Sequence, residues 1–122
     1  EAGADTLKGT YGSAPVLNPE DLTGAGKTFL DSYTAKYGSP EVYTAYAAAA
    51  AQALLDAIGR SDGSREDVVA KLFETNITDG IVGPMSFNAN GDPTAGLISV
   101  FLAEASGPPW KFQEAVKVSA AS

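Results

Sequence analysis

The stretch SPEVYTAYAAAAAQALLDAIG, from Ser39 to Gly59, decides how the rest of this 122-residue chain is arranged. It predicts one long helix with a signal at each end. Ser39 is the expected N-cap, Pro40 suits the first helical position, and Glu41 suits the positive end of the helix dipole. Gly59 is the expected left-handed stop.

One apolar stripe is expected to run along this helix, because its apolar residues recur at helical spacing. The stripe consists of Val42, Tyr46, Ala49, Ala53 and Ala57, with Leu54 and Ile58 beside it. The run Ala47 to Ala51 permits close approach of a neighbouring backbone. We therefore expect the helix to be covered on more than one side, at the centre of a layered α/β arrangement.

The residues before this helix predict a strand, a turn and a second helix. Thr6 to Leu17 begins as a strand, which Gly12-Ser13-Ala14-Pro15 is expected to break. Asn18-Pro19-Glu20 has the form of a short helical turn. Gly26 to Tyr37 is expected to be helical, because Phe29, Tyr33 and Tyr37 recur every four residues. Gly38 would end that helix.

The residues after the central helix predict another helix and then three strands. Ser64 and Asp67 have the form of a capping box at a helix start, and Asn90-Gly91 is typical of a hairpin turn after Met85 and Phe87. Gly96 to Ala103 is apolar enough for a strand buried on both faces. After an interruption at Gly107-Pro108-Pro109, a last strand is expected from Trp110 to Val118, followed by a frayed tail at Ser119 to Ser122.

The composition excludes several kinds of function. A net charge of −7 leaves no basic stripe for nucleic acid and disfavours an anionic membrane surface. The chain has no Cys and no His, which removes thiolate nucleophiles, Ser-His-Asp triads and the commonest metal ligands. No carboxylates are paired in a way that marks an acid–base couple, so we expect no catalytic residues, no metal site, no cofactor and no enzyme activity.

Three short motifs have both a functional and a structural interpretation. Asn88, Asn90 and Asp92 around Gly91 suggest a calcium loop, but the Gly and Glu that an EF-hand loop requires at its sixth and twelfth positions are absent, which favours a hairpin turn. Gly24-Ala25-Gly26 resembles half of a phosphate loop without the Lys-Ser/Thr that follows it. Tyr43 and Tyr46 would suit stacking on a ligand, while the position of Tyr46 on the stripe favours a place in the core.

Several short motifs follow one another in a definite order along the chain. They are Leu7-Lys8-Gly9-Thr10-Tyr11, then Phe29, Tyr33, Lys36-Tyr37-Gly38 and Pro40, then Tyr43 and Ala45-Tyr46-Ala47-Ala48, then Gly83-Pro84-Met85-Ser86-Phe87 and Gly91-Asp92. In this order they resemble the C-terminal third of solute-binding proteins of the leucine/isoleucine/valine type. The resemblance covers about Thr6 to Val118, with Asn88 in place of the usual Asp of the hairpin.

This resemblance implies a fragment of the two-lobed type I periplasmic binding fold, an α/β fold with a layered sheet and packed helices. Residues 1–122 would form one partial domain: 1–17 a hinge crossover strand, 18–100 the later half of the N-terminal lobe, and 101–122 the last crossover and terminal strand. The abrupt opening at Glu1-Ala2-Gly3-Ala4 favours the same interpretation, and no signal peptide opens the sequence. Such a fragment would have lost neighbours of the apolar strand Gly96 to Ala103, so we expect it to self-associate.

The implied function is that of an extracytoplasmic solute-binding component of an ABC importer. Its partners would be an amino acid or a similar small polar solute and a membrane permease. An alternative on the same fold is the ligand-binding sensor domain of a signalling receptor. By position, this part of the chain would offer one wall of the ligand cleft, made by Ser39, Pro40, Glu41 and Tyr43. Glu41 would select a cationic group on the ligand or, alternatively, act only as a favourable first-turn charge.

Overall fold

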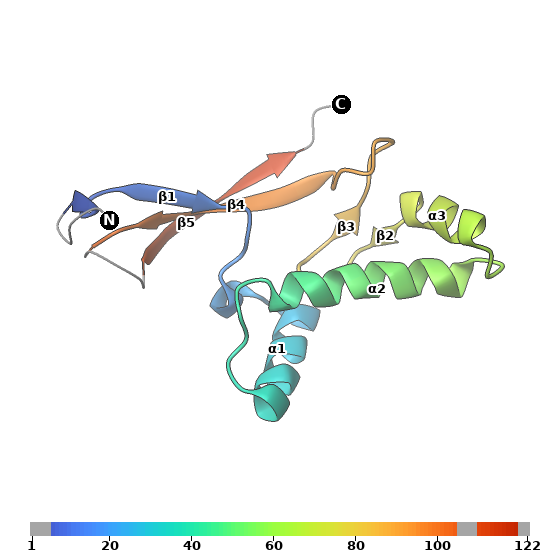
Figure 1. Ribbon diagram of the computed structural model, residues 1–122, viewed down its shortest axis with the longest axis horizontal. Coiled ribbons are helices and arrows are strands. Elements are labelled where there is room, and N and C mark those ends of the chain that lie inside the picture. The colour runs from blue at the N-terminus through green and yellow to red at the C-terminus, as the bar shows by residue number, and fades with distance from the viewer. Residues whose placement is uncertain (1–5, 105–109, 120–122) are drawn as a thin grey trace.

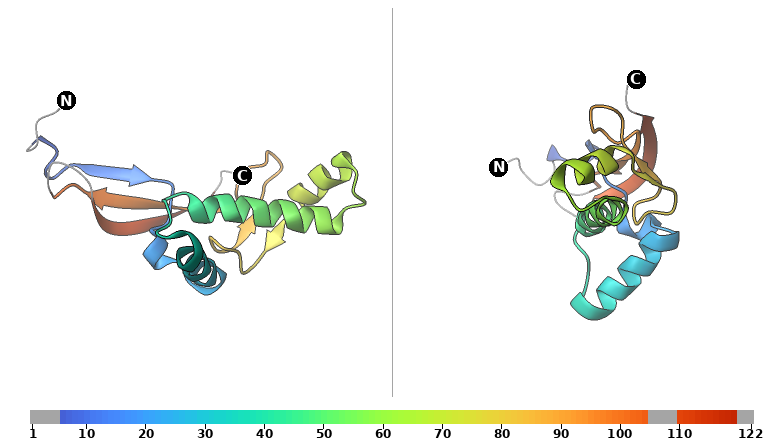
Figure 2. Two further views of the ribbon diagram at one scale, coloured as in Figure 1. Left: turned by 60° about the horizontal axis from the view of Figure 1, so that its bottom comes forward. Right: turned by 90° about the vertical axis from the view of Figure 1, so that its right-hand side faces the viewer.

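Three helices and two small sheets make up the structure, a computed structural model that describes residues 6–104 and 110–119 (Figure 1). The three-stranded sheet extends past the N-terminal end of the longest helix, as the left view of Figure 2 shows. In chain order the elements are β1 (Tyr11–Ala14), the short 3-10 helix η2 (Pro19–Asp21), α1 (Gly24–Tyr37), α2 (Thr44–Arg60), α3 (Arg65–Phe73), β2 (Asn76–Ile77), β3 (Met85–Ser86), β4 (Ala95–Leu102) and β5 (Lys111–Ser119).

The larger sheet is antiparallel throughout and has the strand order β1-β4-β5. Tyr11 lies opposite Leu102, and Ala95 lies opposite Ser119. The first strand lies later than predicted, because β1 occupies Tyr11–Ala14, where the strand was expected to break. Residues before Tyr11 form a turn around Gly9, whose φ is 84°, and the strand ends before Pro15, which has no N–H for the ladder.

The prediction that the apolar strand near Gly96 is buried on both faces is wrong. β4 is the central strand, but its only buried residue is Ser99, and its other side chains are partly or fully exposed. Sequence hydrophobicity could not reveal this, because burial requires a layer on each face and the described chain supplies no second layer there.

The final strand is close to the prediction, although Trp110 does not belong to it. Trp110 lies against Gly12 of β1, where any Cβ would collide with the indole ring. Phe112 lies opposite Phe101 with ring centroids 6.0 Å apart in an edge-to-face arrangement. Ser119 is still part of β5. The expected interruption at 107–109 and the end of the chain at 120–122 lie outside the described residues.

Both predicted ends of the central helix are wrong. α2 begins at Thr44, because the hydroxyl of Thr44 accepts the backbone N–H of Glu41 at 3.0 Å and leaves residues 40–43 outside the helix. Ser39 therefore caps nothing, and Pro40 is not the first helical residue. Gly59 is helical, and α2 continues to Arg60, whose guanidinium bonds Asp56 and the carbonyl oxygen of Lys71.

The buried stripe of α2 is narrower than expected and made only of alanines. Ala45, Ala49, Ala53 and Ala57 are 0–4% exposed. The larger members of the expected stripe lie mostly outside it: Val42, Leu54 and Ile58 are 44–49% exposed. The expectation that α2 is covered on more than one side is therefore wrong for the described chain, where only the alanine face of the helix is fully buried.

The predictions for the other two helices are confirmed near their ends. α1 ends at Tyr37, and Gly38 has a φ of 87° with its N–H bonded to the carbonyl oxygen of Thr34. The side chain of Ser64 caps α3 by accepting the N–H of Asp67. The return bond of the capping box is different, because the Asp67 carboxylate accepts the N–H of Asp62 instead.

The predicted hairpin turn is confirmed. Phe87 and Pro93 form an antiparallel bridge, and the N–H of Asn88 donates to the carbonyl oxygen of Asp92 at 2.9 Å. Gly91 has a φ of 87°, which a glycine adopts without strain. The strand before this turn, β3, pairs with β2 beside α2 and α3 in a second sheet.

The buried apolar set is small, and most of its members are alanines: Val16, Leu22, Ala45, Ala49, Ala53, Ala57 and Ala103. The accessible surface of the chain is 8207 Å², whereas roughly 6,200 Å² is usual for a compact monomer of 12.5 kDa. Large apolar side chains such as Leu55 and Phe73 remain 68% and 48% exposed. The chain therefore presents apolar faces that residues 6–104 and 110–119 do not cover.

Candidate functional site

The four residues expected at the ligand cleft lie together in the loop between α1 and α2. Gly38 opens the loop and Thr44 closes it, with the Glu41 N–H bonded to the Thr44 hydroxyl and the Thr44 N–H bonded to the Glu41 carbonyl oxygen. Ser39, Glu41 and Tyr43 are exposed, and Pro40 is partly buried. The loop is thus held by its own backbone and presents its side chains outward.

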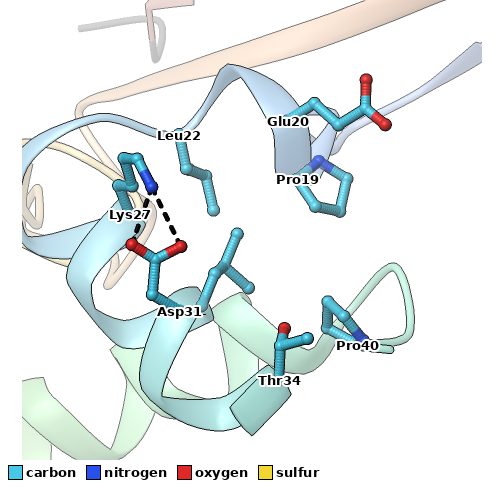
Figure 3. Close-up of a pocket in the computed structure, with 8 residues that line it drawn as sticks. Pro19, Glu20, Leu22, Lys27, Asp31, Thr34 and Pro40 are labelled. Atoms are coloured by element: carbon cyan, nitrogen blue, oxygen red, sulfur yellow. Dashed lines mark hydrogen bonds and ion pairs between the residues drawn. The ribbon is translucent and has the colours of Figure 1, made fainter. Parts of the chain in front are cut away.

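Pro40 lines a hollow of about 240 Å³ between this loop, η2 and α1 (Figure 3). The Lys27–Asp31 ion pair, 2.7 Å long, stands on one side and Pro40 on the other. The hollow is smaller than the ~300–1,000 Å³ of most small-molecule sites, so it suits one wall of a cleft better than a complete site. The lining residues are Pro19, Glu20, Leu22, Lys27, Leu30, Asp31, Thr34 and Pro40.

Tyr43 and Tyr46 have different environments. Tyr43 is 62% exposed, and its ring meets the edge of Tyr46 at 6.4 Å between centroids. Tyr46 is partly buried, and its hydroxyl oxygen accepts the backbone N–H of Leu17 at 2.6 Å. Of the two alternatives for these tyrosines, the structure therefore gives Tyr46 an internal role and leaves only Tyr43 free to touch a ligand.

Glu41 is exposed and lies three residues before the first residue of α2. Its alternative role as a first-turn charge is therefore wrong, because the first turn of α2 contains no acidic residue. No side-chain hydrogen bond or ion pair of Glu41 is found within the described chain. A carboxylate in this position remains accessible to a cationic group from outside.

The Gly24-Ala25-Gly26 segment has a packing role. A Cβ on Gly26 would overlap the carbonyl oxygen of Ile81, and a Cβ on Gly24 would lie 3.0 Å from the Asp79 carboxylate. These glycines let the loop between β2 and β3 approach the start of α1. An acidic side chain beside Gly24 also disfavours a phosphate there.

The Asn88–Asp92 loop uses its polar side chains internally. Asn88 Oδ1 accepts the backbone N–H groups of Asn90 and Asp92, each at 2.9 Å, as expected of an Asx turn. Within residues 6–104 and 110–119, no three acidic side chains come close enough to share a metal ion. Likewise, no helix in that part of the chain has the length and apolar character that a membrane span requires.

The perturbed carboxyl groups lie at the far end of α2, away from the candidate loop. The backbone and then the side chain of Ser64 lower the pKa of Asp62 by hydrogen bonding. The Lys71–Glu74 hydrogen bond of 2.9 Å lowers the pKa of Glu74 and raises the pKa of Lys71. These groups form the exposed corner between α2 and α3, where they act on stability.

Two polar side chains that the sequence analysis did not single out connect distant segments. Ser99, fully buried in β4, donates its hydroxyl to the carbonyl oxygen of Val16. Gln52 in α2 accepts the backbone N–H of Ile81 at 3.1 Å. Each stands alone in an apolar run, and a lone polar residue in such a run is the signal that could have indicated them.

Comparison with solved structures identifies the fold. No family model matches the chain, and neither does any curated protein sequence. Over 92% of its length the chain is similar to a leucine binding protein, LivK, from Thermotoga maritima, with a TM-score of 0.74 and 23% identity. It is also similar to the branched-chain amino acid transporter substrate binding protein LivJ from Streptococcus pneumoniae, solved with isoleucine (TM-score 0.65, 22% identity, 90% of the chain).

A third similar structure is an ABC transporter substrate-binding protein from Desulfitobacterium hafniense in complex with Leu, with a TM-score of 0.68 and 19% identity over 88% of the chain. The chain spans about a third of the length of these three proteins, 32%, 30% and 32% respectively. The chain therefore has the α/β fold of part of a type I periplasmic binding protein, as its sequence motifs predict.

Proposed function

We propose that this chain is part of the extracytoplasmic solute-binding component of an ABC importer, and that this protein binds an amino acid or a similar small polar solute. The observation that carries the proposal is the shared fold, since three structures that it resembles with TM-scores of 0.65–0.74 are named as leucine-binding or substrate-binding proteins. The importer permease is its proposed partner. None of these three proteins is named as an enzyme, in keeping with an absence of turnover.

In this proposal the loop between α1 and α2 forms one wall of the solute cleft. Tyr43 supplies an exposed ring, and the Glu41 carboxylate has no partner in the described chain. Pro40 and Ser39 complete the wall, with Pro40 fixed over the hollow beside α1. Solute affinity would come mainly from closing a second lobe over this wall, because a cleft open on one side leaves the solute hydrated.

Calorimetry tests this function on the full product of the reading frame that encodes the chain. Leucine, isoleucine, valine, glutamate and lysine are titrated in turn, and saturable binding of at least one is expected. Tyr43→Ala should weaken that binding by roughly tenfold, the loss of about 1.4 kcal/mol of contact. Tyr37→Ala is the matched control, because Tyr37 is as exposed, at 65%, and lies outside the wall.

The outcomes separate the function from its site. Absence of binding to any amino acid would contradict the proposed solute class. Binding that is unaffected by Tyr43→Ala and Glu41→Gln would retain the function and remove this loop from the cleft. A solute that binds but gives no association with a permease would favour the sensor alternative.

We also propose that the 122-residue chain self-associates, but through surfaces other than the predicted ones. β4 was the expected open strand, yet β1 and β5 pair with both of its edges. The uncovered apolar residues Leu55 of α2 and Phe73 of α3, 68% and 48% exposed, are better candidates. Light scattering at high micromolar concentration should show oligomers that Leu55→Lys diminishes. A monodisperse wild-type monomer would contradict self-association.

A further inference from the structure

The peptide group between Val16 and Leu17 is held at both of its ends by side chains from distant elements. Its carbonyl oxygen accepts the hydroxyl of Ser99 from β4, which is 83 residues away in the sequence. Its N–H donates to the hydroxyl oxygen of Tyr46 from α2 at 2.6 Å, 29 residues away. Val16 itself is 2% exposed, so this peptide has little access to water.

The need for these two bonds follows from the sequence around the end of β1. β1 ends at Ala14, before Pro15, which lacks a backbone N–H. The Val16–Leu17 peptide therefore lies beyond the sheet ladder and needs partners elsewhere. A buried peptide without partners would carry a large desolvation penalty. Ser99 lies opposite Ala14 in the register, one position from where the chain leaves the sheet. Tyr46 lies in the first turn of α2, beside the same exit.

We propose that Ser99 and Tyr46 are positioning residues that clamp the Val16–Leu17 peptide and thereby fix the angle between the three-stranded sheet and the helices. The sheet extends past the N-terminal end of α2, so a small rotation at this exit displaces its far end widely. A trans peptide points its C=O and N–H in opposite directions, so bonds at both ends prevent rotation of the peptide plane. The two bonds also strengthen each other through the polarised amide.

This clamp does not depend on the proposed solute function, because every contact in it lies within the chain. It assigns Tyr46 a role in alignment and leaves Tyr43, its edge-to-face neighbour, for the surface. A second bond, from the Ile81 N–H to Gln52, ties α2 to the loop between β2 and β3. The clamp thus connects α2 to the three-stranded sheet, and the bond of Gln52 connects α2 to the two-stranded sheet.

Amide hydrogen exchange tests the first half of the proposal on the 122-residue chain. Tyr46→Phe removes only the hydroxyl, and the Leu17 amide should then exchange roughly tenfold faster, as expected when one hydrogen bond is lost. Amides in the middle of α2 should keep their protection. Tyr37→Phe is the matched control because Tyr37 is exposed and its hydroxyl forms no hydrogen bond within the described chain. An unchanged Leu17 rate, or an equal loss of protection at all amides, would overturn the clamp.

Distances between two spin labels test the second half. The chain has no cysteine, so Glu66→Cys on α3 and Lys117→Cys on β5 can be labelled specifically. The distance distribution should be narrow in this doubly labelled background and should broaden on adding Tyr46→Phe or Ser99→Ala. Tyr37→Phe and Ser32→Ala, which remove the same groups from exposed positions, should leave it unchanged. Equal widths in all five proteins would show that the clamp does not set the angle.

Discussion

The three-stranded sheet and α2 are held in place by different kinds of contact. In the sheet, backbone ladders join β1, β4 and β5, while nearly every side chain of β5 is exposed and Ser99 is the only buried residue of β4. In α2, the buried face consists of four alanines that are 0–4% exposed. Outside Gly12, which Trp110 covers, and the buried Ser99, the sheet therefore tolerates changes of side-chain size, whereas the buried face of α2 depends on side chains staying small.

The strongest test of this difference enlarges a buried alanine of α2. Ala49→Trp should lower the free energy of unfolding by about 3 kcal/mol or more, or abolish folding, because overpacking costs about 1–3 kcal/mol even for smaller insertions. Ala49 is 2% exposed, whereas Ala50 beside it is exposed. Ala50→Trp should therefore change stability little, as measured by urea unfolding. Equal loss in both variants would mean that α2 is covered on a second side after all.

This contrast also explains which parts of the fold the sequence predicted. Three signals that act within one turn were reliable: Gly38 ends α1, Ser64 caps α3, and Asn90-Gly91 forms its turn. The ends of α2 were predicted wrongly, since Thr44 and Arg60 make competing bonds that Pro40 and Gly59 do not reveal. The buried stripe was predicted too wide. Ala49, Ala53 and Ala57 are buried as expected, whereas the larger residues beside them, Leu54 and Ile58, are 44% and 46% exposed.

The candidate site was predictable only in part, for a related reason. Residues 39–43 do share one loop, as their proximity in sequence ensures, but only Pro40 lines the hollow. Which loop residues face a cleft depends on surfaces that local periodicity does not describe. The clamp was also hidden from the sequence analysis, since its bonds span 29 and 83 residues.

A smaller effect is expected where a helix meets a loop. Gly26→Ala should destabilise the chain by about 1–3 kcal/mol, because its new Cβ would collide with the main-chain oxygen of Ile81, which cannot move alone. Gly59→Ala is the control, and it should change stability in the opposite direction. Gly59 lies inside α2 with open space around it, so alanine there should stabilise by about 0.5–1 kcal/mol. Thermal unfolding of both variants measures this, and destabilisation by Gly59→Ala would contradict the extent of α2 at its C-terminal end.

The smallest expected effect concerns pH and the exposed corner between α2 and α3. Ser64 lowers the pKa of Asp62 from its ordinary value of 3.8, and the Lys71 hydrogen bond lowers the pKa of Glu74 from 4.5. A carboxyl whose pKa is lower in the folded state binds its proton less readily there than in the unfolded state. Its stabilising contribution is therefore fully present above the ordinary value and is lost as the pH falls through the folded value.

The contribution of Lys71 to stability depends on pH in the opposite direction, because the bond to Glu74 raises the pKa of Lys71 above 10.5. Its contribution is present below that value and is lost as the pH rises through the folded pKa. Urea unfolding at pH 7, 4 and 3 should thus show a modest acid loss that Asp62→Asn and Glu74→Gln each reduce. Glu66→Gln is the control, because Glu66 is an exposed residue of α3, and it should leave the loss of stability in acid as in the wild type. If Glu66→Gln and Glu74→Gln had equal effects on the acid loss, general charge repulsion rather than the Lys71–Glu74 pair would govern it, and the corner would contribute no specific contact to the position of α3 against α2.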